Sequence, residues 1–181
     1  MTEQGIPIHY VCTHEKAKEL VDAHAKFWVC NCGCREAHKG CARSRMDLCL
    51  MFHPDDPGSG SGKHEISAKD AQAILDEARV NHLVARPFRS EARTGTDGIC
   101  FCCDDCCGYF LHPEEKCDKG DLVSATDVDA CTDCGACTDI CYFRARTMEE
   151  GKLAVDVDAC YGCGLCRDAC QEACIDMVPR T

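Results

Sequence analysis

Two cysteine runs with the same spacing lie near the C-terminal end of this 181-residue chain. Two residues separate the first three cysteines of each run, and three separate the third from the fourth: Cys131, Cys134, Cys137 and Cys141, then Cys160, Cys163, Cys166 and Cys170. Thiolates at this spacing can converge on one metal cluster from a single loop, and the spacing is typical of [4Fe–4S] ligands. The two runs therefore predict iron–sulfur clusters.

The two runs belong to one internal repeat. The four residues before Cys131, Asp-Val-Asp-Ala, recur before Cys160. Between the runs, the segments 146–148 and 152–155 flank a Glu-Glu-Gly sequence that predicts a short hairpin with glycine in its turn. Duplication of a one-cluster unit produces a module with two related metal centres.

Residues from about 124 to 178 resemble a bacterial-type two-cluster ferredoxin, on the evidence of these runs and their duplication. In that family, the first three cysteines of one run share a cluster with the fourth cysteine of the other run. The resemblance implies one cluster held by Cys131, Cys134, Cys137 and Cys170. It implies a second cluster held by Cys160, Cys163, Cys166 and Cys141.

The chain departs from the ferredoxin pattern at three positions. Tyr142 and Gln171 stand where the family usually has proline. Unlike proline, each has a backbone N–H, which could bond to a ligand sulfur and shift the reduction potential of the cluster. Cys174 is a ninth cysteine in this module, and we interpret it as a packed thiol and not as a ligand.

The N-terminal two thirds of the chain hold further cysteines in two groups. The candidate metal ligands here are Cys32, Cys34, Cys41, Cys49, Cys100, Cys102, Cys103, Cys106 and Cys107. Cys100, Cys103 and Cys106 have the spacing of the first three ligands of a cluster run. Because adjacent side chains point in different directions, Cys102 and Cys107 are expected to face away from that cluster and to serve another one. Three hypotheses stay open: two further [4Fe–4S] clusters, one cluster with spare thiols, or a structural zinc site. Arg35 could donate to a cluster sulfide or pair with a carboxylate.

This N-terminal region also resembles a group of uncharacterised multi-cluster iron–sulfur proteins of anaerobes. The resemblance rests on Cys32-Gly33-Cys34-Arg35 and on the motif from Ile99 to Cys107, followed by the ferredoxin-like module. It implies electron transfer in anaerobic metabolism and names no substrate.

Composition favours metal over disulfides as the use of the 21 cysteines. The chain shows no signal peptide and no apolar run of about eighteen residues, so we expect a cytoplasmic protein without a membrane span. A net charge of −11 argues against nucleic acid as a partner. It is equally compatible with docking to redox partner proteins that carry a basic patch and with simple solubility.

The expected fold is α+β, with two domains. Residues 1–120 are predicted to form a mainly helical cysteine-rich module with irregular metal-binding loops, and residues 121–181 a ferredoxin-like two-cluster domain. One helix is predicted from Thr13 to about Trp28. A second is predicted to begin at a Ser67–Asp70 capping box and to bury Ala71, Ile74, Leu75 and Ala78.

Three functions are compatible with these patterns. The first is an electron carrier that relays single electrons between redox partners. The second is an enzyme, or its electron-feeding subunit, with an open-site cluster in the N-terminal module. The third is a redox or metal sensor. We favour the carrier, because electron carriage is the usual use of such clusters.

Overall fold

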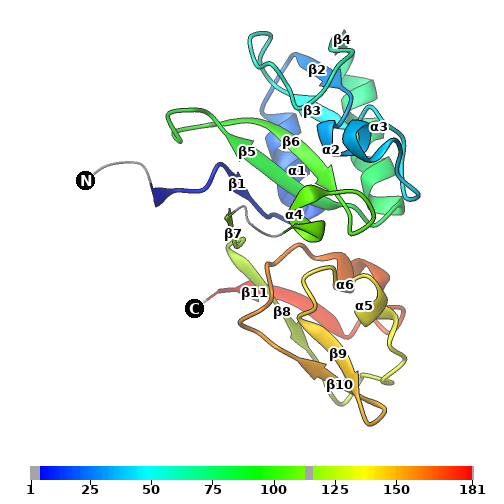
Figure 1. Ribbon diagram of the computed structural model, residues 1–181. Coiled ribbons are helices and arrows are strands. Elements are labelled where there is room, and N and C mark those ends of the chain that lie inside the picture. The colour runs from blue at the N-terminus through cyan, green and yellow to red at the C-terminus, as the bar shows by residue number, and fades with distance from the viewer. Residues whose placement is uncertain (1–4, 113–115, 181) are drawn as a thin grey trace.

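The N-terminal part of the molecule is built on a seven-stranded sheet. The computed structural model describes residues 5–112 and 116–180. The strand order is β4-β2-β3-β6-β5-β1-β7 (Figure 1), and described neighbours are antiparallel except for the parallel pair β1–β7. The strands are β1 (His9–Tyr10), β2 (Phe27–Cys30), β3 (Cys49–Met51), β4 (His64–Ile66), β5 (Val84–Arg89), β6 (Thr96–Cys102) and β7 (Cys117–Asp118).

Two helices cover one face of this sheet. They are α1 (His14–Asp22) and α3 (Ala68–Val80), and their apolar faces pack in one core with strand residues such as Val29, Leu50 and Ile99. The predicted capping box is confirmed: Ser67 and Asp70 bond reciprocally at the start of α3. The predicted buried face of this helix is confirmed too. Local rules were sufficient here because the cap and the apolar stripe lie within one segment.

The opposite face of the sheet carries cysteines. Side chains alternate between the faces of a strand, so Cys100 and Cys102 share a face of β6 while Ile99 and Phe101 enter the helical core. Cys49 pairs directly with Cys30 on one side and with Cys100 on the other. We call this surface the cysteine face. Two short helices, α2 (Gly33–His38) and α4 (Gly108–Leu111), follow β2 and β6 in the chain.

The C-terminal part consists of two small sheets and two short helices. β8 (Leu122–Thr126) pairs antiparallel with β11 (Ile175–Pro179), so the two ends of this part lie side by side. β9 (Arg146–Glu149) and β10 (Lys152–Val155) form the predicted hairpin. The helices are α5 (Ala136–Asp139) and α6 (Leu165–Ala169), and each follows a glycine at φ near 80°. Figure 1 shows this part below the seven-stranded sheet.

The mixed α+β class is as predicted, but the expectation of a mainly helical N-terminal module was wrong. The helix expected to reach Trp28 ends at Asp22, and Phe27–Cys30 is a strand with a neighbour on each side, second from one edge of the sheet. The sequence Phe-Trp-Val-Cys favours strand once β3 and β4 are available on either side. The division at residue 120 stays a prediction, although the seven-stranded sheet ends at Asp118 and the two small sheets begin at Leu122.

An ion-pair network joins the two parts. Asp168 of α6 accepts from Arg79 of α3 at 3.2 Å and lies 3.5 Å from Nδ1 of His14 on α1. Glu15 accepts from both Arg79 and Arg167. No helix among the described residues combines the length and apolar character needed to cross a bilayer.

Candidate metal centres

Four cysteines from the two C-terminal runs surround a first hollow. It is lined by Cys131, Cys134, Cys137 and Cys170, with Leu153, Ile175 and Cys174 beside them, and its empty volume is about 340 Å³. Cys137 lies on α5, and Cys170 directly follows α6. The contact between these two helices therefore brings the last cysteine of the second run to the first run.

The other four cysteines surround a second hollow. It is lined by Cys141, Cys160, Cys163 and Cys166, with Ser124, Phe143 and Arg146, and its empty volume is about 330 Å³. Among the described residues, none of these eight thiols hydrogen-bonds to another of the eight. The two hollows group the cysteines as the ferredoxin resemblance implies, three from one run with the fourth from the other. Ligation itself remains a proposal.

Cys174 lies closer to the first hollow than the sequence suggested. Its side chain is buried, as expected of a packed thiol, but it also lines the hollow. Its Sγ is 3.4 Å from Sγ of Cys170. The first hollow therefore has five thiols at its wall. The backbone N–H of Tyr142, which a proline would lack, donates to the carbonyl of Ile140 and therefore does not face a sulfur.

A buried arginine connects the two hollows. Arg146 Nη1 donates to Sγ of Cys137 at 3.8 Å, and its Nη2 donates to Oγ of Ser124 at 2.9 Å. Ser124 Oγ is in turn 3.7 Å from Sγ of Cys160, which lines the second hollow. Burial disfavours the charge of Arg146, but the neighbouring thiols of Cys166 and Cys137 outweigh burial and raise its pKa. The guanidinium is therefore a fixed positive charge between the two hollows.

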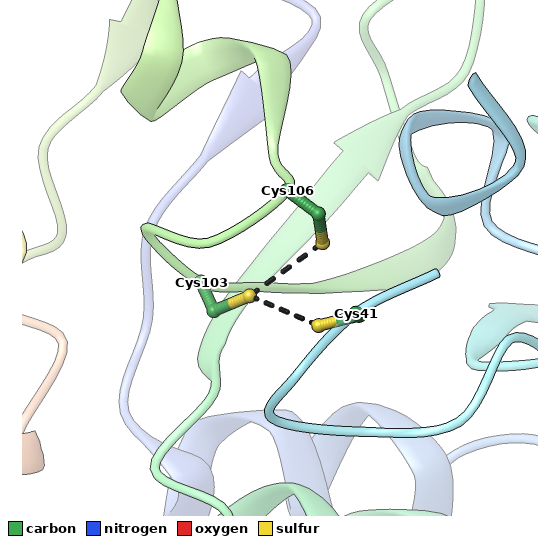
Figure 2. Close-up of side chains that lie close together, drawn as sticks. All are labelled: Cys41, Cys103 and Cys106. Carbon is green, nitrogen blue, oxygen red and sulfur yellow. Dashed lines mark hydrogen bonds between the residues drawn. The ribbon is translucent and has the colours of Figure 1, made fainter. Parts of the chain in front are cut away.

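In the N-terminal part, three thiols lie in direct contact. Cys41, Cys103 and Cys106 have their sulfur atoms within 4.8 Å of one another. The Sγ–Sγ distance is 3.5 Å between Cys41 and Cys103, and 3.6 Å between Cys103 and Cys106. Figure 2 shows the three side chains converging from two loops, one after α2 and one after β6. We call this set the 41–103–106 group.

A second set gathers at the end of the cysteine face. The thiol of Cys107 neighbours those of Cys34 and Cys102, and Cys34 also neighbours Cys32. Arg86 reaches this set from β5, with Nη1 3.7 Å from Sγ of Cys102 and 3.6 Å from Sγ of Cys107. The guanidinium also lies over the ring of Tyr109, 4.2 Å from its centroid. These cysteines line an open hollow with an empty volume of about 930 Å³.

The remaining cysteines on this face form a row across three strands. Cys30, Cys49 and Cys100 stand opposite one another on β2, β3 and β6. A hydrogen bond with Cys100, together with burial, raises the pKa of the Cys49 thiol to about 12. His9 Nε2 lies 3.8 Å from Sγ of Cys100. Cys100 lies outside the 41–103–106 group, although it lines the open hollow together with Cys106.

Each buried arginine among the described residues lies beside thiols. Arg35, Arg86 and Arg146 are all less than 4% exposed. The ion pair considered for Arg35 is not observed in the described part of the chain: its guanidinium donates to the carbonyls of Arg45 and Phe101. Burying a charge without a counter-charge is costly. Beside Arg35 and Arg146, the anions that the described residues offer are thiolates, free or bound to metal.

Aromatic rings fill the space between the two parts. Phe143 and Tyr161, which line the second hollow, are stacked with ring centroids 4.3 Å apart. Tyr109, whose ring lies under Arg86, makes edge contacts with both of them at 6.4 Å. The rings therefore connect the second hollow to the cysteine face.

Sequence reasoning missed Arg86, Arg146 and His9. Nothing in their local sequence distinguishes them from surface residues, because their thiol partners lie between 9 and 91 positions away in the chain. No family model matches this chain, and no curated protein matches it either. The close cysteine groups by themselves suggest metal or iron–sulfur binding.

Proposed function

We propose that this protein is an iron–sulfur electron carrier that relays single electrons between cytoplasmic redox partners. The observation that carries the proposal is the pair of similar hollows, each lined by three cysteines of one run and the fourth of the other. Such a set of four thiolates fits a [4Fe–4S] cluster, which supplies one-electron chemistry when bound. The residues need no acid, base or nucleophile for this role.

The surroundings of the hollows support electron carriage. Cys137, Cys160 and Cys166 are buried, and buried thiolates with few donors favour low potentials. Arg146 opposes this by placing a positive charge between both sets. The hydrogen-bonded series from Cys137 through Arg146 and Ser124 to Cys160 links the two sets over a short span. The chain's acidity would guide a partner with a basic docking patch.

The first test is anaerobic purification followed by measurement of iron, zinc and acid-labile sulfide. Two clusters in the C-terminal part require about eight irons and eight sulfides per chain. A chain with less than about four irons after anaerobic reconstitution would overturn the proposal.

Single substitutions then test the exchange of the fourth cysteine. Cys141→Ala should remove the same reduced-state EPR signal as Cys166→Ala, since both residues line the second hollow. Cys141→Ala should not affect the other EPR signal, which Cys137→Ala removes. If Cys141→Ala and Cys137→Ala remove the same signal, the grouping is wrong. Ser124→Ala is the matched control, because it changes a neighbour of Cys160 without removing a thiol.

One observation favours a second candidate, an electron-feeding subunit or small reductase. The open hollow of about 930 Å³ is lined by cysteines together with His9, Arg86 and His112, which could admit and orient a small anion. Adding azide or cyanide to the reduced protein tests this function. A change in a signal that Cys107→Ala abolishes would support it, and unchanged spectra would count against it.

A further inference from the structure

Among the described residues, Cys41, Cys103 and Cys106 are three thiols whose sulfur atoms all lie within 4.8 Å of one another. A tetrahedral zinc ion with Zn–S bonds of about 2.3 Å has sulfur ligands about 3.8 Å apart, the edge of the tetrahedron. The Sγ–Sγ distances are 3.5 Å between Cys41 and Cys103 and 3.6 Å between Cys103 and Cys106. In a [4Fe–4S] cubane each thiolate binds a different iron, so the ligands stand outside the cube and farther apart. The spacing therefore fits one metal ion and not a cluster.

The chain elements around these thiols already hold them in place. Cys103 and Cys106 are separated by two residues, the spacing typical of half a zinc site. Arg43 Nε donates to Asp104 at 2.8 Å, and the backbone N–H of Ala42 donates to Asp105 at 2.8 Å. These bonds join the loop that carries Cys41 to the loop that carries the other two. The site is thus prearranged by contacts other than the thiols.

Charge gives a second, independent indication. Arg35 is 1% exposed, and its Nε atom has no hydrogen-bond partner in the described part of the chain. Its side chain nevertheless reaches the thiol of Cys106. Three thiolates and one divalent ion carry a net charge of −1, which a single guanidinium neutralises. If these three thiols were neutral, only the thiol of Cys32, which also acts on Arg35, would offer that buried guanidinium a counter-charge.

We propose that Cys41, Cys103 and Cys106 bind one thiophilic divalent ion, with Zn²⁺ as the probe, through three thiolates. The fourth position is left to a ligand other than cysteine. On binding, each thiol releases its proton to solvent and no electron is transferred. The ion would tie the loop after α2 to the end of β6 and take no part in electron transfer. The proposal does not depend on the C-terminal clusters.

Zinc K-edge X-ray absorption of the full chain, purified without oxygen, tests the site without a variant. We expect about one zinc per chain, a first shell dominated by sulfur at about 2.3 Å, and no iron neighbour in the next shell. A zinc shell made only of nitrogen and oxygen would overturn the proposal.

Metal analysis of matched variants tests the ligands. Cys106→Ser and Cys41→Ser should each lose about one zinc per chain and keep the iron and sulfide of the parent protein. Cys12→Ser is the control, because Cys12 is buried in the same core but lies outside the group. Loss of about four irons from Cys106→Ser, with no zinc in the parent, would show a cluster at this position and overturn the proposal. An unchanged metal content would also overturn it and leave three neutral thiols.

Discussion

The two parts of the molecule arrange their cysteines in opposite ways. In the C-terminal part, eight thiols stand apart around two hollows. In the N-terminal part, thiols contact one another along one face of a sheet and in the loops that follow it. Separated thiols leave room for a polynuclear cluster, whereas three thiols that all lie within 4.8 Å of one another match the ligand spacing of a single ion. The two scaffolds therefore space the same residue type in different ways.

The buried cores of the two parts also differ in the residue types that form them. The N-terminal core contains large apolar side chains such as Phe27, Leu50 and Ile74, packed between sheet and helices. The buried clusters of the C-terminal part consist largely of the cysteines themselves, with Ile175 and Val123. A core of this kind has little apolar area to bury without metal. We therefore expect the C-terminal part to depend on the proposed clusters for folding.

Removing the clusters should produce the largest difference between the parts. Metal binding can contribute on the order of 10 kcal/mol to the folding of a small metal domain. After removal of iron by a chelator, amide hydrogens in β8 and β11 should lose protection by about a hundredfold or more, while those in α3 keep theirs. Hydrogen exchange with mass spectrometry measures both. Equal loss of protection in β11 and α3 would contradict the contrast between the two cores.

Breaking the ion-pair network should loosen the contact between the parts. Burial favours the neutral form of Asp168, but hydrogen bonds with His14, Arg167 and Arg79 outweigh burial and hold its pKa well below the ordinary value of 3.8. Asp168→Asn should lower the free energy of unfolding by about 1–3 kcal/mol, between the values for exposed and buried pairs. Urea unfolding of the cluster-loaded protein measures it, with the exposed Asp176→Asn as control.

The direction in which stability changes with pH follows from the lowered pKa of Asp168. A depressed carboxyl pKa contributes stability that is fully present above the unfolded value and is lost as the pH falls through the folded value. The difference between Asp168→Asn and the parent should therefore stay constant between about pH 5 and 8. It should shrink only below the ordinary value of 3.8. A difference that shrinks already near pH 6 would mean that another group, not Asp168, is titrating.

Removing the charge between the hollows should change both clusters together. Arg146→Gln takes a positive charge from beside Cys137 and Cys166, so both potentials should fall. We expect shifts on the order of 60 mV, the one-electron equivalent of a tenfold change in equilibrium constant. Redox titration followed by EPR measures them, and Arg144→Gln, which is exposed, is the control. A shift in the potential of one cluster alone would contradict the position of Arg146 between the two clusters.

The smallest effect is expected at the fifth thiol of the first hollow. Because Cys174 lies 3.4 Å from Cys170, it can replace that ligand with little movement. Cys170→Ala should therefore keep most of its iron, within about one atom per chain of the parent value. The double variant Cys170→Ala/Cys174→Ala should lose about four irons. If Cys170→Ala alone loses a whole cluster, Cys174 is a packed thiol and nothing more.

Local spacing was enough to predict several features of this chain. The repeated cysteine runs indicated two related metal centres, and the structure surrounds two hollows with their side chains. The hairpin of residues 146–155 and the capped helix after Ser67 also agree with prediction. Each depends on interactions between residues a few positions apart, which a sequence displays directly.

The N-terminal part could not be predicted in this way. Its sheet pairs β3 with β6 and β1 with β5 and β7, segments separated by dozens of residues, and all of its strands except β5 and β6 are too short to show a period. These pairings group Cys41 with Cys103 and bring Arg86 to Cys107. Spacing along the chain instead suggested that Cys100, Cys103 and Cys106 belong together. A strand turns successive residues to opposite faces, so only long-range packing decides which thiols meet.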